Sequence, residues 1–188
     1  MGRHYARIAF TPAVRAEQQR IGSLAHYARM AEAGREDDAL TGAEAGFIAA
    51  RDSLTMASVS ETGWPYLQHR GGPPGFVRVL DARHIAFAEL GGNRQHVSRG
   101  NLAGNDRVAL FFMDYPNRRR LKLLGHARVV EDEPALLARL APPGEAGQAE
   151  VGRAEAAIVI EVAGFEWNCP QHITPRYTAA EWAALAQG

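Results

Sequence analysis

The sequence predicts an α+β domain in which an antiparallel β-barrel is flanked by helices at both ends of the chain. Three observations support this fold class. Short runs of β-branched and aromatic residues follow one another between residues 54 and 162. Turn-forming residues separate most of these runs, which is typical of hairpins and of antiparallel pairing. Because strands and crossover helices do not alternate, we expect the long sheet to close into a barrel rather than form a parallel layer.

Two helices are expected before the first strand. Residues 12–33 carry apolar side chains at helical spacing among polar ones, namely Ile21, Leu24, Ala25 and Ala28. Thr41 and Glu44 have the spacing of a capping box, in which the threonine caps the helix and the glutamate reaches back to it. The helix that they begin is expected over residues 45–51.

The strands are expected where apolar, β-branched residues cluster. They fall at residues 54–60, 66–70, 76–80, 85–90, 108–113, 121–130 and 156–162. Gly63 lies between the first two, where a positive φ suits a hairpin turn. Residues 71–75 break the ladder, because proline lacks an N–H group and glycine relaxes φ. Short helices are expected at residues 95–100, 133–140 and 178–186.

The composition argues against several classes of function. The 188 residues carry 21 basic and 21 acidic side chains, so we expect no general attraction to nucleic acid or to an anionic membrane. A single cysteine, Cys169, excludes an internal disulfide and a CxxC zinc site, and it fits a reducing cytoplasm. The histidines show no HxH or HxxxH spacing, so no metal site is expected. Without a signal peptide or a membrane-spanning apolar run, a cytoplasmic protein is expected.

Three stretches follow one another in a characteristic order: FIAARDSLTMASVSETGWPYLQHRGGPPGFVRVLD, AFAELGGNRQHVSRGNLAGNDRVALFFMDY and RRRLKLLGHARVV. They contain a strand pair, a glycine-rich crossing, a basic loop, an Asn-Leu…Asn…Val-Ala-Leu passage and a Gly-x-Ala-x-Val strand. In this order they resemble the FMN-binding split barrels related to pyridoxamine 5'-phosphate oxidase. The tail WNCPQHITPRY resembles the aromatic and basic C-terminal element of the same proteins.

This resemblance implies a six-stranded split β-barrel and a homodimer. Two FMN molecules would lie at the dimer interface, each touched by both subunits. Residues 1–188 would then form one domain with a helical extension (1–51), a barrel (52–165) and a C-terminal tail that covers the flavin (166–188).

The basic loop is expected to hold the FMN phosphate. By resemblance this loop comprises Asn93, Arg94 and Gln95, and Arg94 is the expected ligand because arginine pairs with phosphate through two parallel hydrogen bonds. The alternative is that Arg94 is a solvated loop residue. Gln95 replaces the family's lysine, so a second cation is needed, and Arg70 and Arg78 are the candidates.

The strand that ends at the glycine-rich crossing resembles the one that lies along the flavin. Its candidate residues are Gln68, His69, Arg70 and Gly71. Because side chains alternate along a strand, we expect Gln68 and Arg70 on one face and His69 on the other. The alternative is an edge strand that carries polar residues for solubility.

The remaining candidates are expected to face other parts of the flavin. Ala88 and Glu89 fall at positions that flank the flavin in the family. Glu89 is a candidate acceptor for the flavin N3–H or a ribityl hydroxyl, or a partner for Arg94. Arg120 aligns with a position that reaches the ring edge, where a cation favours the reduced flavin. The alternative is that Arg120 belongs to a solvated basic turn.

The C-terminal element supplies the last candidates, Trp167, Gln171 and His172. Trp167 is expected to cover the flavin of the other subunit, and His172 falls where the family places a basic residue. The alternative is that Trp167 anchors a dimer interface without touching the cofactor. Pyridoxamine 5'-phosphate oxidases carry an Arg-x-His motif here, whereas residues 172–174 read His-Ile-Thr. The resemblance therefore gives no support for vitamin B6 oxidation and leaves the substrate open.

The sequence thus predicts an FMN-dependent oxidoreductase that acts on a small molecule, with the catalytic residues unassigned. Two alternatives stay open. The same fold can hold haem or the deazaflavin F420, with His69, His96 or His172 as candidate haem ligands, or the protein can bind flavin without catalysis. The GNRQ loop favours FMN, because a flavin phosphate needs such a site and haem does not.

Overall fold

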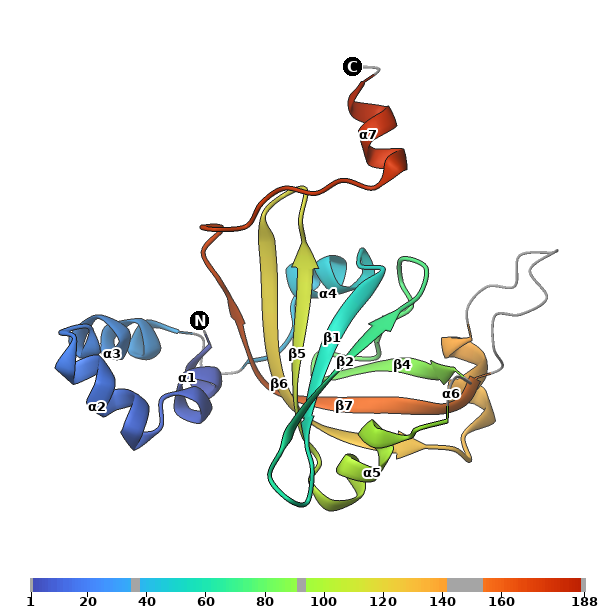
Figure 1. The fold of residues 1–188 in the computed structure, drawn as a ribbon, viewed down its shortest axis with the longest axis horizontal. Helices are drawn as coiled ribbons and strands as arrows, with labels where there is room; N and C mark the ends of the chain where they lie inside the picture. The colour runs from blue at the N-terminus through green and yellow to red at the C-terminus, as the bar shows by residue number, and fades with distance from the viewer. Residues whose placement is uncertain (1, 35–37, 91–93, 142–153, 187–188) are drawn as a thin grey trace.

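The computed structural model describes residues 2–34, 38–90, 94–141 and 154–186, and its centre is a curled antiparallel sheet (Figure 1). The 7-stranded sheet has the order β2-β1-β5-β6-β7-β4-β3. Its strands are β1 Ser53–Val59, β2 Pro65–Gly71, β3 Arg78–Val79, β4 His84–Leu90, β5 Arg107–Asp114, β6 Arg119–Val130 and β7 Ala154–Trp167. The α+β class and the antiparallel barrel are confirmed, and the seven strands fall where the seven runs were expected, one more than the six strands that the resemblance implied.

Two strand predictions need correction. Residues 76–80 were expected to form a full strand, but only Arg78–Val79 pairs with β4. The N–H of Phe76 instead donates to the carbonyl of Pro73 at 2.9 Å, which keeps this stretch in a turn. β7 is also longer than expected, because Trp167 still pairs with Leu121 at the far end of β6.

The N-terminal helices also differ from the prediction. The single helix expected at residues 12–33 is two, α2 (Pro12–Arg20) and α3 (Leu24–Ala33), and a further helix, α1 (Arg3–Ala9), precedes them. Gly22 breaks the long helix because its φ of 79° lies in the left-handed region, which glycine enters freely. The other helices are α4 Gly42–Ala49, α5 Val97–Gly104, α6 Pro134–Leu140 and α7 Ala179–Leu185. The capping box that begins α4 is confirmed.

The core fills the inside of the curled sheet. Fully buried side chains from β1, β5, β6 and β7 meet there, with α4 closing one end; they include Met56, Leu110, Leu123, Ile160 and Ile48. A smaller apolar cluster, including Ala86, Val159, Leu136 and Leu140, holds α6 against the outside of β4 and β7. Each large aliphatic side chain buried in this way contributes about 1.5–3 kcal/mol.

Gly125 lets β6 and β7 approach closely. A side chain at this position would place its Cβ 2.5 Å from the carbonyl oxygen of Glu161, so only glycine fits. The pairing register shifts between Leu124 and Gly125, as at a β-bulge, while β6 continues through this point. Bulges of this kind bend a strand, and this one helps β6 to curl around the core.

Candidate functional site

A polar cavity of about 280 Å³ lies where the edge strand β2, the end of β4 and the start of α5 meet. Its lining comprises Tyr66, Gln68, Arg70, Glu89, Leu90, Arg94, Gln95, His96, Val97, Ser98 and Glu155. The structure thus brings together five of the residues predicted from sequence: Gln68, Arg70, Glu89, Arg94 and Gln95. Asn93, which was also predicted, lies outside the described residues.

The alternation of β2 decides which of its residues reach the cavity. Tyr66, Gln68 and Arg70 are half-buried on one face, whereas His69 and Gly71 are exposed on the other. This is the division that the strand period predicts. Gly71 lines instead a separate apolar hollow of about 70 Å³, which it shares with Ala88.

Glu89 lies between two arginines at the floor of the cavity. Its carboxylate is 3.6 Å from Nη2 of Arg70 and 3.6 Å from Nη1 of Arg99, and the residue is only 8% exposed. Arg99 also forms a close ion pair with Glu131. Glu89 therefore pairs with Arg70 and Arg99 rather than with Arg94, which was one of the partners predicted for it. Arg99 was missed because only tertiary packing brings α5 beside β4.

Arg70 is a half-buried cation whose hydrogen-bonding groups are incompletely satisfied. Burial lowers the pKa of its guanidinium below the usual value, and the attraction of Glu89 and then of Tyr66 only partly opposes this effect. Two buried atoms, Nε of Arg70 and Oε2 of Glu89, have no hydrogen-bond partner within the part of the chain that the structure describes. Such atoms cost free energy unless a bound group satisfies them.

The loop before α5 has a strained backbone. Arg94 and His96 have φ angles of 56° and 50°, a left-handed conformation that is unfavourable for residues with a side chain. His96 occupies the N-cap position of α5 without a side-chain hydrogen bond to the helix, and the first turn carries no acidic residue. The backbone N–H groups in the first turn of α5 therefore create a partial positive charge on the side of the loop that faces the cavity.

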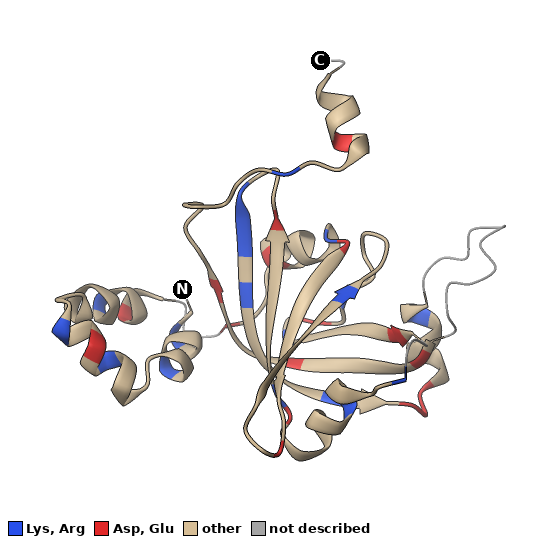
Figure 2. Cartoon of the chain, in the orientation of Figure 1, with Lys and Arg blue, Asp and Glu red and all other residues tan. Residues whose placement is uncertain are grey.

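The other predicted residues lie away from this cavity. Arg78 is exposed on β3 and does not line it. Arg120 belongs to the basic run at the start of β6, which Figure 2 shows near the tip of the β5–β6 hairpin. Nε of Arg120 is buried without a hydrogen-bond partner among the described residues. In the tail, Gln171 is exposed and His172 has a left-handed φ of 62°.

Trp167 is held firmly by contacts within the chain. Its indole N–H donates to Oε1 of Glu44 at 2.8 Å, and its ring packs edge-on against Phe47 at 4.7 Å. The guanidinium of Arg119 lies 4.7 Å from the centre of the Trp167 ring. These contacts fix the side chain at the α4 end of the barrel.

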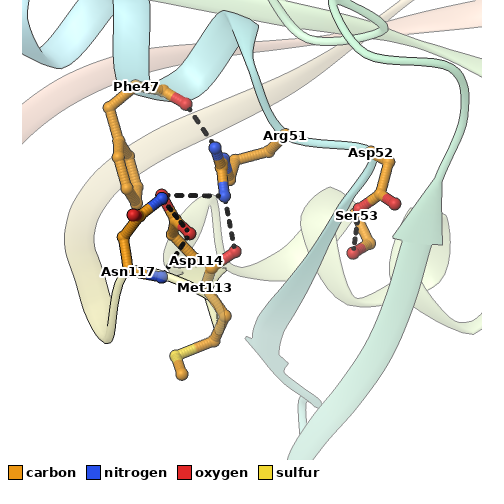
Figure 3. Close-up of polar contacts among 7 residues, drawn as sticks. All are labelled: Phe47, Arg51, Asp52, Ser53, Met113, Asp114 and Asn117. Carbon is orange, nitrogen blue, oxygen red and sulfur yellow. Dashed lines mark hydrogen bonds and ion pairs between the residues drawn. The ribbon is translucent and has the colours of Figure 1, made fainter. Parts of the chain in front are cut away.

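A buried polar network supports the same end of the barrel (Figure 3). Arg51 Nη1 lies 3.3 Å from Oδ2 of the buried Asp114 and donates to the carbonyl of Met113 at 3.3 Å. Asn117 Nδ2 donates to both carboxylate oxygens of Asp114, at 3.0 and 3.1 Å. The network ties the end of α4 to the β5–β6 hairpin, so this hairpin is rigidly placed.

A comparison with known protein families shows to which family the chain belongs. Residues 40–166 match the family described as pyridoxamine 5'-phosphate oxidase. The chain belongs to the pyridoxamine 5'-phosphate oxidase family. The match covers the barrel and every described residue of the cavity, while α1, α2 and α3 lie before it.

Solved structures share the fold of this family member at low sequence identity. A candidate pyridoxamine 5'-phosphate oxidase from Lactobacillus delbrueckii is 19% identical with a TM-score of 0.53, covering 70% of this chain and 96% of its own. HupZ from Group A Streptococcus is 17% identical with a TM-score of 0.54, covering 73% and 100%. An FMN-binding protein from Syntrophomonas wolfei is 11% identical with a TM-score of 0.52, covering 66% and 83%. A search of curated proteins gave no match.

Two further searches of the described residues concern metals and membranes. No cluster of three or more His, Cys, Asp or Glu side chains in residues 2–34, 38–90, 94–141 and 154–186 is arranged to hold a metal ion. Within the same ranges, no helix has the length and apolar character needed to cross a bilayer.

Proposed function

We propose that this family member binds FMN, with the phosphate in the cavity between β2, β4 and α5. The observation that carries the proposal is the buried Nε of Arg70, which lacks a hydrogen-bond partner among the described residues and belongs to a side chain that lines the cavity. A phosphate oxygen satisfies such a donor and compensates the buried charge. Arg94 lines the same cavity and is exposed, so it is free to close on a bound phosphate.

Arg70 would also supply the positive charge that the predicted phosphate loop lacks. Gln95 stands where the family places a lysine, and Arg70 lines the same cavity as Gln95, whereas Arg78 does not. Arg70 would thus contribute the second cation, and the first-turn N–H groups of α5 would add donors.

Glu89 would have two roles in this arrangement. Its carboxylate holds Arg70 and Arg99 from opposite sides, and this restricts the orientation of Arg70. Oε2 of Glu89, which is ion-paired with Arg99 but has no hydrogen-bond partner among the described residues, would accept a hydrogen bond from a ribityl hydroxyl or from the flavin N3–H. A site with such an acceptor beside the unpartnered Nε of Arg70 suits a ligand that offers both phosphate oxygens and hydroxyl groups.

We further propose a homodimer in which each flavin is touched by both subunits. Four apolar residues lie opposite one another on neighbouring strands and form a row on the outer face of the sheet. They are Leu67 on β2, Ala57 on β1, Ala109 on β5 and Leu124 on β6. Leu67 is 68% exposed. Trp64, in the turn before β2, is 76% exposed. Covering this face with a second copy would bury apolar surface.

The function supported best is an oxidoreductase that acts on a small molecule. Bound FMN supplies the redox chemistry, while the protein orients the cofactor and sets its electrostatic surroundings. The unmatched Arg-x-His motif argues against pyridoxamine 5'-phosphate as the substrate.

An FMN titration followed by quenching of flavin fluorescence tests the cofactor assignment. We expect saturable binding in the wild type and at least about tenfold weaker binding in Arg70→Gln, which removes a charged hydrogen-bond partner. Arg78→Gln, on the neighbouring β3, is the matched control and should bind as the wild type does. Equal affinity in Arg70→Gln and the wild type would refute the phosphate assignment.

Turnover separates an enzyme from a flavin-binding protein. The FMN-loaded protein should oxidise NADH or NADPH in the presence of oxygen, followed by loss of absorbance of the reduced nucleotide. Binding of FMN without any nucleotide oxidation would favour the non-catalytic alternative.

A further inference from the structure

An open hollow of about 390 Å³ lies between α1 and the outside of the barrel. Its walls come from α1, from the turn before β4, and from β6 and β7; they are His4, Arg7, Ile8, Arg83, His126, Glu161, Val162 and Ala163. No residue of this hollow lines the cavity between β2, β4 and α5. It is therefore a separate feature of the molecule.

The polar lining of this hollow is predominantly basic. Arg7 and Arg83 face it, and neither forms an ion pair with another residue in the ranges that the structure describes. His4 and His126 add two protonatable rings, and His126 lies 3.1 Å from Asp106. Glu161 is the single acidic residue of the lining. Two uncompensated guanidinium groups in one hollow attract an anion.

The wall formed by α1 is held rigidly against β7. A side chain at position 164 would place its Cβ 2.6 Å from the backbone nitrogen of Tyr5, so Gly164 is what allows this close approach. Oδ2 of the buried Asp38 accepts hydrogen bonds from the N–H groups of Tyr5, at 2.8 Å, and Phe165, at 3.3 Å. Asp38 thus caps α1 and joins it to β7 at one point.

The opposite wall is fixed as well. The N–H of Val162 donates to the carbonyl of Arg83 at 2.7 Å, which ties the turn before β4 to β7. Both arginines extend from anchored backbone, so both side chains start beside the same hollow, and because they are exposed they are free to turn toward an anion.

Three of the eight residues that line this hollow lie outside the family match. The match begins at residue 40, whereas His4, Arg7 and Ile8 come from α1. The hollow therefore needs the N-terminal extension of this chain and is not a property of the family barrel alone.

We propose that this hollow is a second binding site, for a small molecule that carries a phosphoryl or carboxylate group. Arg7 and Arg83 would bind the anionic group, and His4 and His126 would add hydrogen bonds to it. Glu161 would accept a hydrogen bond from a hydroxyl or ammonium group of the same molecule, while the exposed Ile8 packs against its apolar part. The proposal does not depend on FMN binding.

Histidine NMR signals test this site separately from the cavity. The protein labelled with ¹³C-histidine is titrated with inorganic phosphate and, separately, with succinate, at constant pH and ionic strength. We expect the signals of His4 and His126 to move saturably with one anion or both, and which anion binds more tightly identifies the ligand group. His96 lines the cavity and reports on that site independently.

Substitutions of the arginines complete the test. Arg7→Gln and Arg83→Gln should each weaken the response of His4 and His126 about tenfold, because each removes a charge-assisted contact. Arg29→Gln, an exposed residue of α3 outside the hollow, is the matched control and should leave it unchanged. Immobile His4 and His126 signals, or equal movement in the Arg7→Gln/Arg83→Gln double variant, would overturn the proposal. Movement of His96 alone would overturn it while leaving the FMN proposal intact.

Discussion

The two regions that contain the predicted cofactor residues differ in how completely their polar groups are satisfied. At the cavity, Arg70 and Glu89 are held 3.6 Å apart, and each keeps a buried atom without a hydrogen-bond partner among the described residues. At the hairpin end, Asp114 is bound by Arg51 and Asn117, and Trp167 is bound by Glu44. We therefore expect the cavity to receive a ligand, whereas most polar contacts of the hairpin end hold the fold together.

This difference separates two kinds of mutational effect. A change of the exposed Arg94 at the cavity should alter ligand affinity with little effect on folding, because this side chain is exposed. Changes at the hairpin end should mainly lower the free energy of unfolding. Arg120 is the exception at that end, because its buried Nε has no hydrogen-bond partner among the described residues. This donor could bind an acceptor group of another molecule.

The largest effect is expected for Asp114→Ala at the hairpin end. It leaves Arg51, whose side chain is only 17% exposed, without its ion-pair partner, and it removes the acceptor of Asn117. Breaking a buried pair in this way should lower the free energy of unfolding by about 3 kcal/mol, measured by urea denaturation. Asp106→Ala, which breaks an exposed pair with His126, should change it by about 0.5 kcal/mol or less. A loss of FMN affinity in Asp114→Ala without a loss of stability would contradict a structural role for the hairpin end.

Arg94→Ala should give the opposite pattern at the cavity. Losing a charged contact to phosphate costs about 1.5–3 kcal/mol, which is about tenfold to a hundredfold in FMN affinity. The midpoint of urea unfolding in the absence of FMN should stay that of the wild type, because Arg94 is exposed. Fluorescence titration and urea denaturation of the same preparation check both statements, with Arg78→Ala as the control. Unchanged affinity would remove Arg94 from the site.

A smaller effect is expected for Glu44→Gln, and it should depend on pH. Burial raises the pKa of Glu44, but hydrogen bonds from Thr41 and Trp167 outweigh burial and leave the pKa below its usual value. The ionised carboxylate therefore stabilises the fold above its unfolded pKa of about 4.3, and this contribution is lost as pH falls through the lower folded pKa.

At pH 7, Glu44→Gln should destabilise the protein by about 1 kcal/mol, and the difference from the wild type should shrink below about pH 4. Thermal unfolding over this pH range measures it. Glu181→Gln alters the same kind of capping box in α7, where no residue is buried, and should have a smaller effect. A difference for Glu44→Gln that persists unchanged at low pH would show that the charge is not what stabilises this end.

Local signals account for the parts of the fold that were predicted correctly. The capping box of Thr41 and Glu44 lies within one helical turn, and the turn at Gly63, with a φ of 87°, needs only its own residue. The break at Gly22 was missed because helix-forming residues on both sides outweigh a single glycine in the pattern. The long pairing of β7 was missed because it depends on β6, which the sequence does not place beside it.

The cavity could be predicted in part for the same reason. Strand alternation placed Gln68 and Arg70 on one face, and the loop order placed Arg94 and Gln95 next to the strand end. Arg99 could not be predicted, because its contact with Glu89 arises when α5 folds back against β4. The contact between Trp167 and Glu44 spans 123 residues and likewise depends on the closed barrel.

The visible absorption spectrum of the purified protein, recorded after mixing with FMN and gel filtration, tests the central claim most directly. We expect the two-band spectrum of a flavin in the protein fraction, with the absorbing species eluting at the volume of a dimer. A colourless protein fraction, or a haem spectrum in the protein as purified, would contradict FMN binding in the cavity between β2, β4 and α5.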